Sequence, residues 1–247
     1  MHPNRVVLVT GAARRIGARI ATHLHARGAD VAIHCRHSVE QAQALVARLN
    51  AVRADSARAF EADLSRASAG ELLVQSAGDW HGRIDALVNN ASTFLRTPLG
   101  SVDESLWASI VDGNLKAAFF TSQAAAPWLR AARGAIVNVT DARAERPLAG
   151  FSAYAAAKAG LVALTRALAL ELAPEVRVNA VAPGSLDWPE HDVFTEAEQR
   201  AIEAAIPLQR IGTGEDVARA VAFLLDDADY VTGHILHVDG GASLVSR

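Results

Sequence analysis

Short runs of apolar residues alternate with amphipathic stretches along most of the chain. The first run, residues 6–9, leads into a glycine-containing turn and an amphipathic stretch that ends at Arg27. Similar apolar runs, each expected to form a buried strand, cover residues 31–35, 59–62, 84–88, 135–140, 176–181 and 235–238. Helical periodicity separates them, over residues 39–53, 65–80, 101–129, 152–172 and 214–225.

This order of elements predicts an α/β fold. The strands are continuously apolar, which is typical of a parallel sheet whose two faces are both covered by helices. We therefore expect one doubly wound (Rossmann) domain over residues 1–247, with about seven parallel strands. A polar and aromatic segment follows the sixth expected strand, and we interpret residues 185–206 as a substrate lid.

Composition narrows the class of protein. Hydrophobic residues make up 51% of the chain and charged residues 21%, which favours a globular fold, and the net charge of -3 argues against a nucleic-acid partner. The chain contains no uninterrupted apolar stretch of about 18 residues, so we predict no membrane span. The single cysteine, Cys35, cannot form an intrachain disulfide, so we expect a cytoplasmic protein. The histidines lack zinc-binding spacing, and we predict no metal.

The first turn carries a phosphate-binding pattern. Gly11 and Gly17 lie between the first strand and the first helix. A glycine turn there presents backbone N–H groups and the positive helix end to a phosphate, as in dinucleotide-binding folds. The pair by itself is equally compatible with a tight turn that binds nothing.

A tyrosine and a lysine supply candidate acid-base chemistry. Tyr154 and Lys158 are four residues apart in an expected helix, so their side chains share one face. Lys158 is one of only two lysines in the chain. An ammonium close to a phenol favours the phenolate, so we expect Lys158 to lower the pKa of Tyr154.

These motifs together resemble the short-chain dehydrogenase/reductase family, over nearly the whole chain. The resemblance includes the Asn89-Asn90-Ala91 segment, the Pro183-Gly184 turn and a helical asparagine, Asn114. It implies a nicotinamide cofactor site with Asp63 near the adenine, Lys158 on the nicotinamide ribose and Asn114 supporting a proton-supplying water chain.

Three positions are similar to the pteridine reductase branch of that family. Arg15 stands where the common turn has its middle glycine, and Asp141 stands where a serine usually precedes the tyrosine. Phe94 follows the Asn-Asn-Ala segment, where that branch uses an aromatic ring to stack a pterin against the nicotinamide. The alternatives are a surface role for Arg15, core packing for Phe94, and a spectator Asp141 with Thr140 supplying a hydroxyl.

The loop after the second strand indicates the cofactor. An acid there would select NAD, but the loop carries Arg36, His37 and Ser38, which suit the 2′-phosphate of NADPH. The full set of expected cofactor-binding residues is Gly11, Arg15, Ile16, Gly17, Arg36, His37, Ser38, Asp63, Leu64, Asn90, Ala91, Ser92, Tyr154, Lys158, Pro183, Gly184 and Ser185.

The resulting prediction is an NADPH-dependent pteridine reductase that converts a dihydropterin, of the biopterin, monapterin or folate type, to its tetrahydro form. The expected catalytic residues are Asp141, Tyr154, Lys158 and Asn114, and the expected substrate-binding residues are Arg15, Ser92, Phe94, Asp141, Tyr154 and Trp188. Family resemblance also implies a homotetramer. The alternatives are a carbonyl reductase, such as a 3-oxoacyl thioester reductase, and a non-catalytic NADP-sensing protein.

Overall fold

The computed structural model describes residues 5–188 and 194–245. Its centre is a parallel sheet of seven strands in the order β3-β2-β1-β4-β5-β6-β7. The strands are β1 (Val6–Val9), β2 (Asp30–Cys35), β3 (Ala57–Glu61), β4 (Ala86–Asn89), β5 (Ala135–Val139), β6 (Arg177–Pro183) and β7 (Ile235–Val238). The expected single doubly wound domain with a parallel sheet of about seven strands is confirmed.

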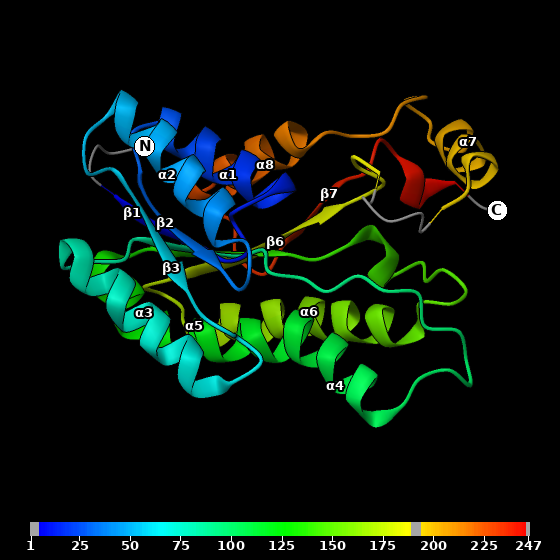
Figure 1. Ribbon diagram of the computed structural model, residues 1–247, viewed down its shortest axis with the longest axis horizontal. Coiled ribbons are helices and arrows are strands. Elements are labelled where there is room, and N and C mark those ends of the chain that lie inside the picture. The colour runs from blue at the N-terminus through cyan, green and yellow to red at the C-terminus, as the bar shows by residue number, and fades with distance from the viewer. Residues whose placement is uncertain (1–4, 189–193, 246–247) are drawn as a thin grey trace.

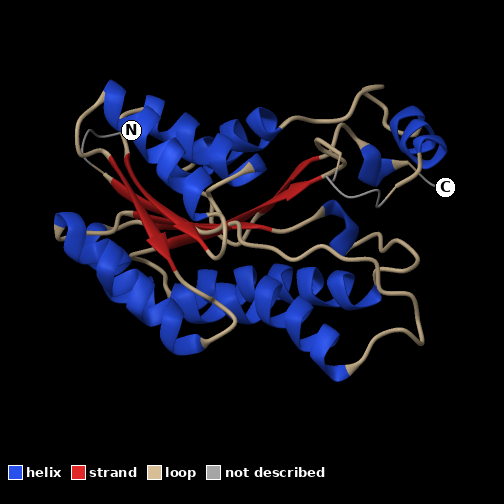
Figure 2. Ribbon diagram, viewed as in Figure 1, coloured by secondary structure: helices blue, strands red, loops and turns tan. Residues whose placement is uncertain are grey.

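Helices cover both faces of the sheet (Figures 1 and 2). One layer contains α1 (Arg15–Ala26), α2 (Val39–Val52) and α8 (Gly214–Asp226). The other contains α3 (Ala67–His81), α4 (Glu104–Val111), α5 (Ala117–Ala132) and α6 (Ser152–Glu171). A shorter helix, α7 (Glu196–Ala204), lies beside the carboxyl ends of β6 and β7, near the C-terminus.

The continuous apolar character of the strands follows from these two layers. Successive side chains in a strand point to opposite faces. Val7 and Val9 accordingly pack in the cluster formed with α1, α2 and α8, whereas Leu8 packs in the cluster formed with α3, α5 and α6. All three side chains are fully buried, so neither face of β1 tolerates a polar residue.

One helix passes a length and composition test for a membrane span. Among the described residues, α6 alone is long and apolar enough to cross a bilayer. Of its apolar window, 56% is buried inside the domain, as expected for a core helix that packs against the sheet.

The helical stretch expected over residues 101–129 differs from the structure in its middle. A π-helical segment, η1 (Asp112–Lys116), separates α4 from α5. A π turn accommodates one extra residue and often occurs at functional sites. Sequence periodicity did not reveal it, because a single wide turn leaves the flanking helical patterns intact.

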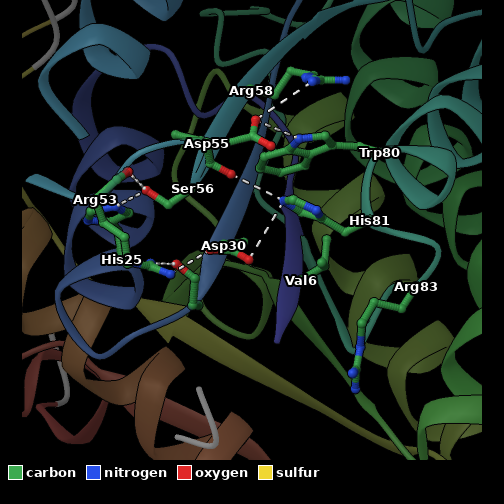
Figure 3. Close-up of polar contacts among 12 residues, drawn as sticks. Val6, His25, Asp30, Arg53, Asp55, Ser56, Arg58, Trp80, His81 and Arg83 are labelled. Carbon is green, nitrogen blue, oxygen red and sulfur yellow. Dashed lines mark hydrogen bonds and ion pairs between the residues drawn. The ribbon is translucent and has the colours of Figure 1, made fainter. Parts of the chain in front are cut away.

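Polar residues join several elements at the amino edge of the sheet (Figure 3). Asp30, at the start of β2, accepts a hydrogen bond from Arg53 at 2.5 Å. His25, near the end of α1, lies with its Nε2 2.7 Å from the hydroxyl of Ser56. The hydroxyl of Ser56 in turn donates to the carbonyl of Arg53. This network closes the edge opposite to the sequence-predicted site.

The described part of the expected lid contains α7. Thr195 and Glu198 form a capping box at its start, with the Thr195 N–H donating to Glu198 at 2.7 Å. Residues 189–193 of the expected lid lie outside the described part of the chain.

Candidate active site

The predicted site residues gather at the carboxyl ends of the strands. The strand order reverses between β1 and β4, and open α/β sheets bind their ligands in the crevice at such a reversal. The first turn follows β1, the Asn90-Ala91-Ser92 segment follows β4, Asp141 follows β5, and Pro183 ends β6. The topology therefore brings residues from distant parts of the sequence to one edge.

The glycine turn is fixed by close backbone packing. Gly11 has a φ of +63°, and a Cβ on it would lie 2.9 Å from the Cα of Ala91. A Cβ on Gly17 would overlap the carbonyl oxygen of Gly11. The side-chain amide of Asn90 donates to the carbonyl of Gly11 at 3.1 Å, and Ile16 packs on the adjoining core. Only glycine fits these two positions, so their presence follows from the turn itself.

Sequence reasoning missed a residue beneath this turn. His34, in β2, is buried, and its Nδ1 accepts a hydrogen bond from the N–H of Gly11 at 3.0 Å. Its Nε2 lies 3.0 Å from the carbonyl of Ala62, to which it donates in the tautomer that these partners require. Burial lowers the pKa of His34, which favours that neutral form. In sequence, the one signal for His34 is a polar residue near the end of an apolar strand.

The basic loop after β2 faces Asp63. Arg36 and Asp63 form an ion pair at 3.9 Å, and both side chains are about half exposed. A hydrogen bond from the Ser65 N–H lowers the pKa of Asp63, and the charge of Arg36 adds to this. His37 is exposed, and Ser38 occupies the N-cap position of α2 without a capping hydrogen bond from its side chain. Leu64, by contrast, is buried in the core beside α3.

Asp141 and Tyr154 form the central contact of the site. The phenol of Tyr154 donates a hydrogen bond to Oδ2 of Asp141 at 2.7 Å. The other carboxylate oxygen, Oδ1, accepts the backbone N–H of Arg143 at 2.7 Å. Asp141 begins a short 3₁₀ turn, η2 (Ala142–Ala144), and Tyr154 lies in the first turn of α6. Both ends of the contact are therefore held by backbone structure.

The expected effect of Lys158 on Tyr154 is wrong in this structure. Burial, followed by the charge and hydrogen bond of Asp141, raises the pKa of Tyr154 well above its ordinary value. The nearby side chain of Ser92 and the charge of Arg143 oppose this rise. Lys158 lies on the same helix face, but its Nζ is 5.7 Å from the centre of the ring. Burial and the directly contacting carboxylate therefore both favour the protonated phenol, which is the form present at neutral pH.

Asn114 is held within the π-helical segment η1. Its Oδ1 accepts a hydrogen bond from the hydroxyl of Ser92 at 2.7 Å, and its amide donates to the carbonyls of Thr93 and Ile110. Asn114 is almost fully buried. Because its hydrogen bonds reach Ile110 in α4 and also Ser92 and Thr93, Asn114 joins α4 to the segment after β4. These contacts bring Asn114, Ser92 and Tyr154 into one connected group.

Aromatic side chains pack around Tyr154. Phe94 lies edge-on to Tyr154, at 4.9 Å between ring centres, and stacks on Phe151 at 4.7 Å. Phe194 continues this group and contacts Trp188 at 6.0 Å. The ring of Phe94 is only partly buried, so it can pack in the core and also contact a substrate.

The guanidinium of Arg15 reaches the segment after β6. Its Nη2 donates to the carbonyl of Asp187 at 2.8 Å. Gly184 donates its N–H to Val238 at 3.0 Å, and a Cβ on Gly184 would lie 2.7 Å from the Cα of Asp239. Ser185 accepts the N–H of Gly212 at 2.9 Å. The structure thus places the first turn beside the turn that ends β6.

Comparison with known proteins agrees with this arrangement. A family model described as enoyl-(acyl carrier protein) reductase matches residues 11–243. The chain belongs to the short-chain dehydrogenase/reductase family. Within that class of nucleotide-binding folds it is an oxidoreductase.

Several curated relatives match along nearly the full chain. The 3-oxoacyl-acyl-carrier-protein reductase FabG of Staphylococcus aureus (strain N315) is 37% identical over 98% of this chain and 99% of its own. Nodulation protein G of Rhizobium sp. (strain N33) is 37% identical over 98% of each chain. The granaticin polyketide synthase putative ketoacyl reductase 2 of Streptomyces violaceoruber is 37% identical over 97% and 96%.

The names of these relatives bear on the predicted activity. Two of the three are named for reduction of an oxoacyl group, which agrees with the alternative activity in the sequence analysis and not with pteridine reduction. The family and the oxidoreductase class are therefore established, whereas the substrate has to be argued from the site.

Proposed function

We propose that the protein is an NADPH-dependent reductase that reduces the C=N bond of a dihydropteridine ring to its tetrahydro form. The observation that carries this proposal is the 2.7 Å hydrogen bond between Tyr154 and Asp141. In the family pattern, a hydroxyl stands at the position of Asp141. A carboxylate in direct contact with the proton-donating phenol adds a negative charge beside the substrate, and this charge affects ketones and pteridines differently.

Electrostatics separates the two substrate classes. Reduction of a ketone develops negative charge on oxygen, and two like charges about 4 Å apart repel by about 4 kcal/mol at an effective dielectric constant of about 20. A carboxylate beside that oxygen therefore opposes ketone reduction. A pteridine instead gains a proton on a ring nitrogen and presents N–H donors, with which a carboxylate forms charge-assisted hydrogen bonds. Asp141 favours the second case.

The residues at the strand ends fit NADPH. The turn of Gly11 and Gly17 joins β1 to the N-terminus of α1, whose positive end suits a phosphate, and residues 35–38 carry no acid that would repel a 2′-phosphate. We propose that Arg36 and Ser38 hold that phosphate, and that Asn90, Ala91 and the segment from Pro183 to Ser185 flank the nicotinamide. When bound, NADPH supplies the hydride.

The protein's own residues would supply and position the proton. Tyr154 is protonated at neutral pH, and its phenol is oriented by Asp141. After giving its proton to the substrate nitrogen, Tyr154 would be reprotonated from a water chain that Asn114 helps to hold, with Ser92 fixed to Asn114 by a hydrogen bond. Lys158, fixed on α6, would bind the ribose of the cofactor. Phe94 would stack on the pteridine, with Arg15 and Trp188 at its rim.

The second candidate function is reduction of a 3-oxoacyl thioester. The relatives described above support it over nearly the entire chain. In the family pattern it uses a hydroxyl at the position of Asp141, and the adjacent Thr140 does not fit that role. Its hydroxyl is buried and donates to the carbonyl of Val181 at 3.0 Å.

Rates of NADPH oxidation with dihydrobiopterin, dihydrofolate and an acetoacetyl thioester test the proposal. We expect kcat/KM to be at least 10-fold higher for one of the dihydropteridines than for the thioester. The Asp141→Ser variant, which restores the family's hydroxyl, should shift that ratio toward the thioester. Turnover of the thioester alone would establish the second candidate and refute the first.

Two further parts of the proposal come from family resemblance. We propose that the protein is cytoplasmic and forms a homotetramer. Multi-angle light scattering of the purified protein measures the mass in solution, and a mass of one chain at micromolar concentration would contradict the assembly.

A further inference from the structure

A cavity of about 250 Å³ opens beside the catalytic pair. Its wall begins at Ala142, the residue after Asp141, and includes Gly184 and Ser185, which we place beside the nicotinamide. The other wall residues come from η2 and the loop after it, the end of α7 and the C-terminal turn, and they are Arg143, Arg146, Pro147, Leu148, Ile202, Ala205, Ile206, Ala242, Ser243 and Val245. Figure 1 shows this C-terminal turn, in red, beside α7.

The cavity combines an apolar surface with two positive charges. Leu148, Ile202 and Ile206 provide apolar wall, whereas Arg143 and Arg146 are its charged members. Arg146 donates one hydrogen bond to the carbonyl of Val245, which holds its side chain at the wall. A guanidinium has five donors in a planar fork, so most of those of Arg146 remain for an anion.

Two acids near the cavity, Glu145 and Asp239, have partners of their own. Glu145 lies 3.7 Å from His237. Asp239 accepts the N–H groups of Gly241 and Ser243, at 2.9 and 2.8 Å. Within the described ranges 5–188 and 194–245, the residues that line the cavity include two arginines and no acid. Its charge therefore suits an anionic group.

We propose that this cavity binds an anionic side chain of the substrate, attached to the pteridine ring through an apolar spacer. This inference rests on the proposed function. A ring placed against Tyr154 and Asp141 would direct its substituent past Ala142 and Gly184 into the cavity. Apolar wall then contacts the spacer, and Arg146 binds the carboxylate or phosphate at its end. The site thus prefers folate-type dihydropteridines to those with neutral hydroxyalkyl side chains.

Two inhibitors, one with an anionic side chain and one without it, test the contact between that side chain and Arg146. Methotrexate carries an aminobenzoyl-glutamate tail, and 2,4-diamino-6-methylpteridine has the same kind of ring without it. Their dissociation constants are measured by fluorescence titration of the NADPH complex. In the unmodified protein, methotrexate should bind at least 10-fold more tightly than the short probe, and added salt should reduce this advantage.

The variant Arg146→Gln should reduce the tail's advantage about 10-fold, the loss expected for one charge-assisted contact. Arg200→Gln is the matched control, because Arg200 is exposed on α7, pairs with Glu196 and does not line the cavity. It should leave the ratio of the two constants unchanged. Thermal melting of both variants checks that they are folded.

The outcomes separate this inference from the proposed function. If both probes bind and Arg146→Gln does not change their ratio, the anionic subsite is refuted while pteridine reduction stands. If neither probe binds, and the acetoacetyl thioester is reduced, both proposals fail. Dihydroneopterin and its phosphate ester distinguish the two anions. A larger effect of Arg146→Gln on the phosphate than on methotrexate identifies phosphate as the preferred group and supports the subsite.

Discussion

The ammonium of Lys158 donates a hydrogen bond to the carbonyl oxygen of Val139, at 2.9 Å. Val139 ends β5, two residues before Asp141, so this bond ties the catalytic helix α6 to the strand that positions the carboxylate. Lys158 is 2% exposed, and burial lowers its pKa to about 8, against the opposing charge of Asp141. The buried amine is therefore close to its titration point near physiological pH.

The first prediction is that Lys158 loses its proton near pH 8 in the cofactor-free protein. Lysine labelled with ¹³C at Cε gives two NMR signals, because the chain has only Lys116 and Lys158. The signal that disappears in Lys158→Arg should shift with a midpoint near pH 8. Lys116→Arg assigns the other signal, and no shift of the Lys158 signal between pH 7 and 9 would refute the prediction.

The lowered pKa of Lys158 also determines in which direction the free energy of unfolding changes with pH. The folded protein binds the lysine proton less tightly than the unfolded chain does. Between about pH 8 and the ordinary lysine value, the unfolded state therefore holds more protons, and the contribution of Lys158 to the free energy of unfolding rises with pH. The difference between the native protein and Lys158→Met in urea unfolding, measured at pH 7.5 and 9.5, should grow in favour of the native protein.

A second prediction concerns the protonation of Tyr154. In a Tyr230→Phe background, Tyr154 is the one remaining tyrosine, so absorbance at 295 nm reports its ionisation alone. We expect no tyrosinate signal up to pH 10, because burial and Asp141 both oppose the charge. Adding Asp141→Ser should make the signal appear at lower pH. An unchanged curve would mean that Asp141 does not control the phenol.

Loss of the phenol itself should stop turnover. Tyr154→Phe should reduce kcat by about 10² to 10⁴-fold, the usual contribution of a general acid. NADPH affinity, measured by quenching of tryptophan fluorescence, should change little. A similar loss of both quantities would indicate a structural and not a proton-donating role.

A third prediction assigns cofactor selectivity to Arg36. Its side chain is about half exposed and pairs with Asp63 at 3.9 Å, so a phosphate would compete with that carboxylate. Arg36→Asp should reduce the preference for NADPH over NADH by about 10-fold, at the lower end for a charge-assisted contact. Arg48→Asp, on the exposed face of α2, makes the same change of charge elsewhere. Equal efficiency with both cofactors in the unmodified protein would refute the assignment.

A fourth prediction separates the two roles of Phe94. Its stacking on Phe151 gives Phe94 a structural function, and its contact with Tyr154 places it at the reacting group. Phe94→Ala should weaken methotrexate binding several-fold, since aromatic stacking contributes about 0.5 to 1.5 kcal/mol beyond area burial. Phe119→Ala removes a comparable ring from α5. If both variants bind methotrexate equally, Phe94 serves only as packing.

A fifth prediction concerns His25, at the opposite edge of the sheet (Figure 3). Burial, with the charge of Arg53, lowers the pKa of His25 against the opposing charge of Asp30. Below its ordinary value of 6.5 the unfolded chain therefore binds the proton first, and stability falls as pH decreases. Urea unfolding at pH 7 and 5 should show a smaller loss in His25→Gln than in the native protein. His234→Gln controls for removal of an imidazole elsewhere.

The sequence predicted the fold well because its information is local. Runs of apolar residues identify strands, and β1 and β7 have the expected bounds. The gathering of Gly11, Asn90, Asp141 and Tyr154 also followed, because parallel strands bring their carboxyl ends together. The spacing of residues along the chain did not predict which side chains contact each other. Tyr154 and Lys158 share a helix face, but burial in the folded domain raises the phenol's pKa most, and the carboxylate that adds to this rise comes from another element.

The residues that sequence reasoning missed share a physical cause. His34 supports the first turn through two hydrogen bonds that exist only once β1, β2 and β3 are paired. Apart from residues 142–148, the wall residue nearest to Arg146 in sequence is Gly184, 38 residues further on, so only tertiary structure joins Arg146 to the cavity. An unusually polar residue inside an apolar strand, such as His34, is the one signal that the sequence did contain.

The π-helical segment η1 also limits how this region can change in length. Each residue of an α-helix turns by about 100°, so one inserted or deleted residue rotates everything beyond it by that angle. Removing one residue from η1 would give a regular helix from α4 into α5, but would turn α4 away from α6 and Asn114 away from Ser92. Single-residue deletions between Asp112 and Lys116 should therefore abolish activity in protein that still folds. The residue count of this segment is as much a part of the site as the side chains are.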